Sequence, residues 1–299
     1  MAEPGEHRAD FSHWYERDVT NLVAMDRVEE ALFRGRENQW NVNGFIYGGQ
    51  VVAQALTAAC GTVSPDRTCH SLHAYFLRGG DATRMVECTV ETTREGRGFS
   101  TRRVVARQGE AIILHAECSF RLPDTGFEHQ TLGPVVPAPE TLPSLEELAE
   151  ARRGILPDSV VDRFARPGPI AIRPVSEGDM FEQLAVPERS VWMRVPSAVN
   201  SDDPFVHQQV LTYASDYWLS GVVPAAHTWP VPSDDIFIAS VDHAIWFHRP
   251  TRADEWLLYH NRSDFAGGGT GLSRGVFYDR ERRPVATVMQ EAVVRRRRT

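Results

Sequence analysis

Asp216 is the residue that could act as a general base. It is the one carboxylate in the stretch His207–Leu219, which we expect to form a helix, and Tyr213, Tyr217 and Trp218 surround it in the sequence. A carboxylate buried among apolar groups has a raised pKa, and such a group can take a proton from water near neutral pH. A solvent-exposed aspartate on a helix would fit the same sequence. Residue type alone therefore leaves open whether Asp216 is a buried base or an exposed helix residue.

Two polar residues on predicted strands could assist such a base. Ser240 lies in a strand predicted over Phe237–His248, where simple alternation places it on the same face as Asp242. A buried hydroxyl there could position a water molecule, although it could also bond to the backbone. Gln290 lies in the last predicted strand, Pro284–Arg295, and its amide can both donate and accept hydrogen bonds. Exposure on an edge strand is the alternative for Gln290.

Other patterns associated with catalysis or ligand binding are weaker. His70 and His73 could pair on a metal ion, but residues three apart on a strand face opposite sides, so we expect no metal site. The glycine run 267–271 lies between two predicted strands and favours a hairpin turn over a phosphate-binding loop. His243 and His248 are interpreted as structural histidines. Every basic side chain is arginine, which excludes lysine Schiff-base chemistry.

The first predicted helix, Gly48–Cys60, begins with two glycines. Backbone N–H groups at a helix start can bind an anion or a developing oxyanion. A tight turn that packs the helix on its sheet would explain Gly48 and Gly49 equally well. This helix contains no Asp, Glu or His, so it offers no general base.

The elements around these residues form the same pattern twice. Each half is predicted as a strand, a helix and then four strands, which gives an α+β fold with a long helix on an antiparallel sheet. Tyr75–Arg78 in the first half resembles Trp246–Arg249 in the second. The predicted strands lie at Leu32–Gly35, Cys69–Leu77, Arg84–Thr93, Ser100–Arg107 and Ala111–Arg121 in the first half, and at Val191–Val195, Phe237–His248, Glu255–Asn261, Gly271–Tyr278 and Pro284–Arg295 in the second.

A proline-rich stretch separates the two halves. Nine of the 19 prolines lie between residues 122 and 186, and proline disfavours both helices and sheet ladders. We expect a linker over 122–186 that crosses the surface. It should hold one short helix, from Ser144 to about Arg153, opened by a capping box with Glu147. The predicted domains are therefore 1–121 and 187–299, joined by this linker.

Composition excludes several classes of protein. The chain has 32 basic and 40 acidic residues, a net charge of −8, so we expect no nucleic-acid partner. No apolar run approaches the roughly 18 residues of a membrane span, so we expect no membrane partner. The four cysteines lie in apolar runs and are interpreted as reduced core thiols. We expect a cytoplasmic homo-oligomer.

Several long segments together resemble the type II acyl-CoA thioesterases, the TesB-like family. Tyr47–Leu56 and His70–Asp81 resemble the first half of that family. Tyr213–Asp216, Asp242–Pro250, Glu255–Tyr259 and the pair Gln290-Glu291 resemble its second half. The resemblance covers about residues 25–121 and 185–295. It implies a double hotdog fold and hydrolysis of fatty acyl-CoA to free fatty acid and CoA, without a metal or other cofactor.

The resemblance also implies a catalytic group of Asp216, Ser240 and Gln290. The hydroxyl position often holds threonine in the family, and serine here is freer about χ1. Asp216 would deprotonate a water molecule that attacks the thioester, with backbone N–H groups near Gly48 as oxyanion donors. Two alternatives remain: a non-catalytic acyl-CoA-binding hotdog protein, and a dehydratase or hydratase. The dehydratase would need a histidine beside the carboxylate, whereas His207 is nine residues from Asp216.

Overall fold

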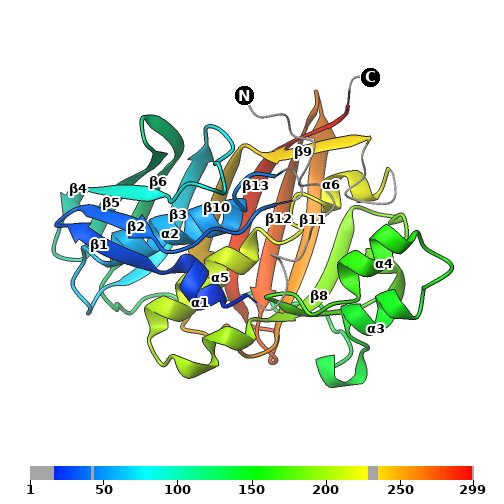
Figure 1. The fold of residues 1–299 in the computed structure, drawn as a ribbon. Coiled ribbons are helices and arrows are strands. Elements are labelled where there is room, and N and C mark those ends of the chain that lie inside the picture. The colour runs from blue at the N-terminus through cyan, green and yellow to red at the C-terminus, as the bar shows by residue number, and fades with distance from the viewer. Residues whose placement is uncertain (1–16, 42–43, 228–234, 298–299) are drawn as a thin grey trace.

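The computed structural model describes residues 17–41, 44–227 and 235–297, and a single antiparallel sheet dominates it (Figure 1). The strands follow the order β1-β2-β4-β5-β6-β3-β10-β13-β12-β11-β8-β7, and β9 pairs with β13 beside this path. Their bounds in the first half are β1 (Met25–Glu29), β2 (Leu32–Gly35), β3 (Thr68–Phe76), β4 (Glu87–Glu95), β5 (Phe99–Gln108) and β6 (Ala111–Arg121). In the second half they are β7 (Ala171–Pro174), β8 (Glu188–Arg194), β9 (Ile236–Ser240), β10 (Asp242–Phe247), β11 (Leu257–Gly267), β12 (Thr270–Tyr278) and β13 (Pro284–Arg296).

The sheet is made of two copies of one strand order. The first half runs β1-β2-β4-β5-β6-β3 and the second half runs β7-β8-β11-β12-β13-β10, and the two copies meet where β3 pairs with β10. The predicted α+β class and the duplication are therefore confirmed. Each copy has one more strand before its long helix than the sequence pattern predicted, namely β1 and β7.

Two long helices lie side by side on one face of this sheet (Figure 1). The first, α2, spans Gly48–Cys60 as predicted, and its small and aliphatic side chains are buried along nearly its whole length. Its two glutamines are also buried, and their amides donate to the Leu22 carbonyl. The remaining helices are α1 (Val19–Val23), α3 (Leu145–Glu150), α4 (Asp158–Phe164), α5 (Pro204–Ser215) and α6 (Val222–Ala225).

The second long helix, α5, ends earlier than predicted. We expected His207–Leu219 with Asp216 in the middle, but the helix stops at Ser215 and Asp216 is its C-cap residue. Hydroxyl groups from elsewhere in the fold satisfy the last carbonyls: Tyr47 donates to Tyr213 O (3.1 Å) and Tyr259 donates to Ser215 O (2.5 Å). The apolar run of the sequence therefore continues past the end of the helix.

The strand predicted over Phe237–His248 is also interrupted. Ser240 pairs with Ala292 and Ala244 with Met289, so four steps along this strand face three steps along β13. The extra residue is a β-bulge, which divides the predicted strand into β9 and β10. A bulge reverses the alternation of side chains beyond it, so the prediction that Ser240 and Asp242 share a face is wrong. The Asp242 carboxylate instead accepts the backbone N–H of Glu291 (2.7 Å).

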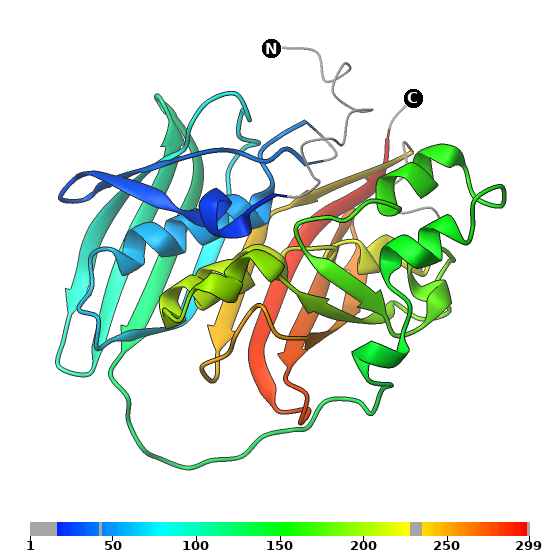
Figure 2. The same cartoon turned by 60° about the horizontal axis from the view of Figure 1, so that its bottom comes forward.

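The proline-rich segment is more structured than predicted. Its first part, residues 122–138, runs around the outside of the molecule without helix or strand (Figure 2). The capping box is confirmed, since Ser144 Oγ accepts the Glu147 N–H (3.2 Å) and the Glu147 carboxylate accepts the Ser144 N–H (2.7 Å). The prediction of one helix is wrong, because α4 follows α3 and β7 then joins the sheet beside β8.

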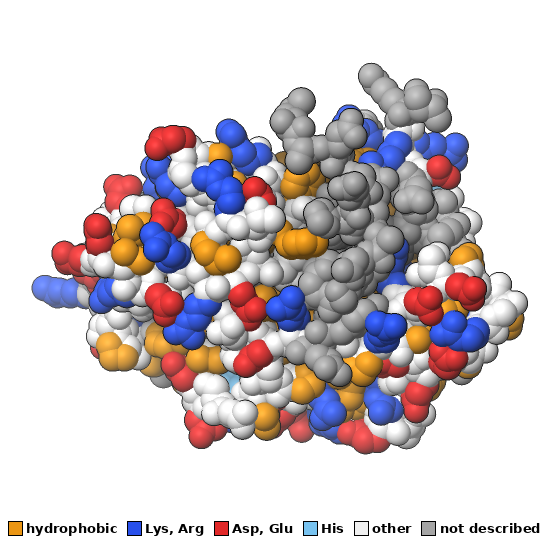
Figure 3. Space-filling view, viewed as in Figure 1, with side chains coloured by type: hydrophobic (Ala, Val, Ile, Leu, Met, Phe, Trp, Pro, Cys, Tyr) orange, Lys and Arg blue, Asp and Glu red, His pale blue; other side chains and the backbone are white. Residues whose placement is uncertain are grey.

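The surface carries charges of both signs, as the composition indicates. Acidic and basic side chains are interspersed on the face shown in Figure 3. Among the described residues, no helix has the length and apolar character needed to cross a membrane.

The predicted turn in the glycine run is confirmed. Gly268 (φ 62°) and Gly269 (φ 87°) connect β11 to β12, and both have backbone angles in the left-handed region that glycine tolerates.

Candidate active site

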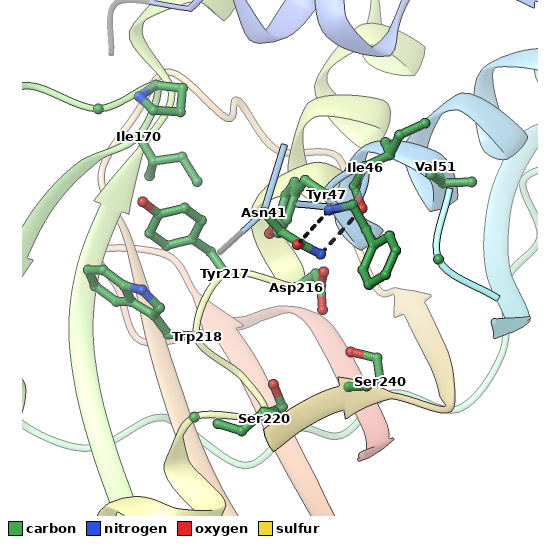
Figure 4. A pocket seen from close by; sticks show the side chains of 18 of the residues that line it. Asn41, Ile46, Tyr47, Val51, Ile170, Asp216, Tyr217, Trp218, Ser220 and Ser240 are labelled. Carbon is green, nitrogen blue, oxygen red and sulfur yellow. Dashed lines mark hydrogen bonds between the residues drawn. The ribbon is translucent and has the colours of Figure 1, made fainter. Parts of the chain in front are cut away.

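A cavity of about 490 Å³ lies between the two halves, and Asp216 and Ser240 are on its wall (Figure 4). The first half contributes the start of α2 and the end of β3 to its lining. The second half contributes β9 and the residues after α5. Ile170 and Ile172, from the segment predicted to be a surface linker, form part of the apolar wall. The cavity is therefore lined by both halves and by the segment that joins them.

Asp216 is held at both carboxylate oxygens. Oδ2 accepts the backbone N–H of Gly49 (2.8 Å), and Oδ1 accepts Nε2 of Gln290 (3.0 Å). The first partner comes from the start of α2 and the second from β13, so the carboxylate of the second half is oriented by elements of both halves. The positive end of the α2 dipole also favours the ionised form of this carboxylate.

Gln290 connects Asp216 to Ser240. The Gln290 side chain is fully buried, and Nε2 donates to Ser240 Oγ (2.5 Å) as well as to Asp216. Ser240 Oγ accepts this bond, which leaves its own proton for another acceptor on the cavity side. The three residues singled out in the sequence are thus brought together, although they lie just after α5, on β9 and on β13.

Burial raises the pKa of Asp216 to about 6, and the hydrogen bonds from Gln290 and Gly49 oppose this effect. The phenols of Tyr47, Tyr213 and Tyr259 lie close to Asp216, and burial raises their pKa values further above 10. These phenols therefore stay neutral while Asp216 titrates.

This raised pKa predicts the pH dependence of catalysis. The ionised carboxylate is the form that accepts a proton, so kcat/KM should fall about tenfold per pH unit below about pH 6 and be flat above it. A pH–rate profile on an acyl-CoA substrate measures this. A profile that stays flat down to pH 4.5 would show that a different group accepts the proton.

The start of α2 lies very close to the end of α5. A Cβ atom on Gly49 would lie 2.5 Å from the Tyr213 carbonyl oxygen, so only glycine allows α2 and α5 to come this close. Gly48 lines the cavity beside Asp216. This confirms that the glycine pair packs tightly, with Gly48 on the cavity wall.

Two further residues, His243 and Ser215, lie behind the site and were not among the predicted catalytic residues. His243, interpreted as structural, is buried with Nδ1 2.6 Å from Gln290 Oε1 and Nε2 2.8 Å from Ser215 Oγ. The β-bulge places His243 on the same side as Ser240, which simple alternation could not reveal. The signal for His243 in the sequence was its position in an Asp-His pair that closely follows Ser240.

Three other described histidines bond to structural groups. Nε2 of His70 lies 2.8 Å from Ser119 Oγ, and Nε2 of His248 lies 2.8 Å from Thr287 Oγ1. His207 bonds to the backbone through both ring nitrogens, which gives no support to a dehydratase histidine. Within the described residues, no three His, Cys, Asp or Glu side chains are grouped as metal ligands.

Two other kinds of potential nucleophile, the cysteine thiols and one serine hydroxyl, have no catalytic surroundings. The four cysteines are free thiols as predicted, and burial raises the pKa of each of them. Residues 271–275 read Gly-Leu-Ser-Arg-Gly, the spacing of a nucleophile elbow, but they lie inside β12. An elbow requires a sharp strand-to-helix turn, so Ser273 is a buried strand residue.

The chain resembles known proteins over nearly its whole length. Residues 36–121 match the family model described as the acyl-CoA thioesterase N-terminal domain, and residues 161–293 match the acyl-CoA thioesterase model. Human acyl-coenzyme A thioesterase 8 is 36% identical, over 93% of this chain and 88% of its own length.

Solved structures show the same arrangement. The acyl-CoA thioesterase II TesB2 of Mycobacterium marinum is 33% identical with a TM-score of 0.76, over 94% of this chain and 98% of that one. A hot dog fold protein of unknown function from Alicyclobacillus acidocaldarius shares the fold, with a TM-score of 0.74 at 18% identity over 93% and 98% of the two chains. The duplicated sheet with its paired long helices is thus a double hotdog fold.

The chain belongs to the acyl-CoA thioesterase family, as the resemblance in the sequence indicated.

Proposed function

We propose that this protein hydrolyses fatty acyl-CoA thioesters to free fatty acids and CoA, with Asp216 as the general base and Ser240 and Gln290 positioning the water. The observation that carries the proposal is the pair of Asp216 and Ser240 on the wall of a largely apolar cavity, joined by Nε2 of Gln290. Family membership supports the substrate class.

The reaction follows from these groups. A water molecule between Asp216 and Ser240 loses a proton to the carboxylate as its oxygen bonds to the thioester carbon. The carbonyl electrons move to oxygen, where a backbone N–H at the start of α2 stabilises the oxyanion. When the tetrahedral intermediate collapses, the C–S bond breaks and the proton on Asp216 passes to the leaving thiolate. The products are the carboxylic acid and the CoA thiol, and Asp216 is ionised again.

The chain's own residues are sufficient for this chemistry. A thiolate leaves readily because thiols are much more acidic than water or alcohols (about 8.5 for the pKa of a cysteine thiol), so neither a covalent intermediate nor a metal ion is needed. A protein that only binds acyl-CoA would have no use for a carboxylate whose pKa is raised by burial and which points into the cavity. We also propose that the protein is a homo-oligomer and that it is located in the cytoplasm.

The test is release of free thiol from acyl-CoAs of increasing chain length, with Ser240→Ala and Gln290→Ala as variants. We expect each variant to lower kcat by about 10²-fold, the scale of losing one positioned hydrogen bond. The double variant should fall by less than the product of the two, because the residues act through one water molecule.

Ser119→Ala is the matched control, because its hydroxyl bonds to His70 on β3, away from the cavity. It should keep the full rate. Retention of acyl-CoA without thiol release by the unmodified protein would instead support a binding protein. Fully multiplicative losses in the double variant would show that Ser240 and Gln290 act separately.

A further inference from the structure

We propose that His243, supported by Ser215, is a positioning residue that fixes the amide of Gln290 with its NH₂ group toward Asp216 and Ser240. This inference rests on the proposed function, since it concerns how the water-positioning group is held. Gln290 has partners on both sides of its amide: Asp216 and Ser240 contact its nitrogen, and His243 contacts its oxygen.

The orientation of the Gln290 amide is not determined by its shape. The oxygen and nitrogen of an amide are nearly equal in size, so a rotation by 180° would fit the same space. The rotated amide would point its carbonyl oxygen at the Asp216 carboxylate and at Ser240. It could no longer donate to either of them, and two acceptors would face each other in a buried site. The productive orientation therefore needs a donor on the opposite side of the amide.

His243 supplies that donor in one of its two neutral tautomers. Burial lowers the pKa of His243 to about 4, although Gln290 and the adjacent Asp242 oppose this effect, so the ring is neutral at physiological pH. A neutral imidazole has one N–H group. When the proton is on Nδ1, it donates to Gln290 Oε1 over 2.6 Å. When it is on Nε2, the Nδ1 lone pair faces Oε1 and favours the rotated amide.

Ser215 completes the chain of hydrogen bonds. Its Oγ lies 2.8 Å from His243 Nε2, and its single proton can be donated either to Nε2 or to the Thr212 carbonyl oxygen, 2.8 Å away. Because Gln290 Oε1 needs the ring proton on Nδ1, Nε2 is then an acceptor, and the Ser215 proton turns to Nε2 instead of Thr212. Ser215 is the last residue of α5 and directly precedes Asp216, so the same helix end holds the base and begins the chain of hydrogen bonds that orients Gln290.

This chain of bonds also matters after proton transfer. Once Asp216 has taken a proton from water, it could donate that proton to Gln290 Oε1 if the amide rotated. The proton would then be held in a stable hydrogen bond rather than passed to the thiolate. The bond from His243 occupies Oε1 and keeps the amide from rotating, so the proton on Asp216 remains available to the leaving group.

The experiment compares His243→Leu with His243→Asn. Leucine removes the donor but fills the space, whereas the amide nitrogen of asparagine can occupy the position of Nδ1 and donate to Gln290. For His243→Leu we expect kcat to fall by about 10²-fold with little change in KM. The acid limb of kcat/KM should also move to higher pH, because the bond from Gln290 lowers the pKa of Asp216. His243→Asn should recover most of the rate and the original acid limb.

Two further variants keep the test decisive. His248→Leu, outside the site and bonded to Thr287, should leave kcat and the pH profile unchanged. Ser215→Ala leaves the packing of His243 intact and should shift the acid limb in the same direction by a smaller amount, which tests the proposal even if His243→Leu fails to fold.

A wild-type pH profile in both His243→Leu and Ser215→Ala would overturn the proposal, as would equal losses in the Asn and Leu variants. The proposed function is tested separately by Asp216→Asn: if that variant is inactive while His243→Leu is normal, the base stands and the positioning role fails.

Discussion

Asp216→Asn should lower kcat for acyl-CoA hydrolysis by about 10²- to 10⁴-fold, the usual contribution of a positioned general base. Asparagine has nearly the same shape and can still accept the Gly49 N–H, so the cavity should keep its form. It cannot accept a proton from water. We therefore expect acyl-CoA to bind with little change in Kd, measured by calorimetry, while thiol release almost stops.

Asp242→Asn is the matched control for this prediction. Its carboxylate lies two residues beyond Ser240, but it bonds to the backbone N–H of Glu291 rather than entering the cavity. Asparagine preserves that acceptor, so kcat should stay close to the wild-type value. If Asp242→Asn were inactive and Asp216→Asn retained its rate, the base would lie on the strand and the proposed mechanism would be wrong.

The sequence was sufficient where local patterns determine the structure. The bounds of α2 follow from a glycine pair, an uninterrupted run of small residues and a final glycine. The glycine turn at 268–269 and the Ser144 capping box depend only on neighbouring residues. Asp216, Ser240 and Gln290, which the structure brings together, could be singled out because their types suit general-base chemistry and because the surrounding segments resemble a known family.

The sequence was insufficient where contacts between distant segments decide the outcome. The end of α5 depends on hydroxyl donors from Tyr47 and Tyr259, which no local pattern reveals. The bulge after Ser240 depends on register against β13, and it determines that His243 rather than Asp242 joins the site. The apolar wall formed by the proline-rich segment likewise depends on where β7 pairs.

Gly49→Ala should lower both stability and activity, although alanine normally stabilises a helix relative to glycine by about 0.5–1 kcal/mol. The added Cβ would lie 2.5 Å from the backbone oxygen of Tyr213 and 2.8 Å from the Tyr47 ring. A backbone atom cannot move aside as a side-chain tip can, so α2 and α5 must separate. Overpacking of this kind costs about 1–3 kcal/mol, which outweighs the gain in helix propensity.

The same separation lengthens the 2.8 Å bond from Gly49 N–H to Asp216, so kcat should fall by about 10²-fold. Urea unfolding and thiol release measure the two effects on one protein sample. Gly98→Ala is the control, because its Cβ would meet no atom within 4 Å, and its free energy of unfolding should stay within about 0.5 kcal/mol of wild type. A Gly49→Ala variant with wild-type stability and kcat would mean that the α2–α5 contact is loose, and that the carboxylate of Asp216 does not depend on the start of α2 for its position.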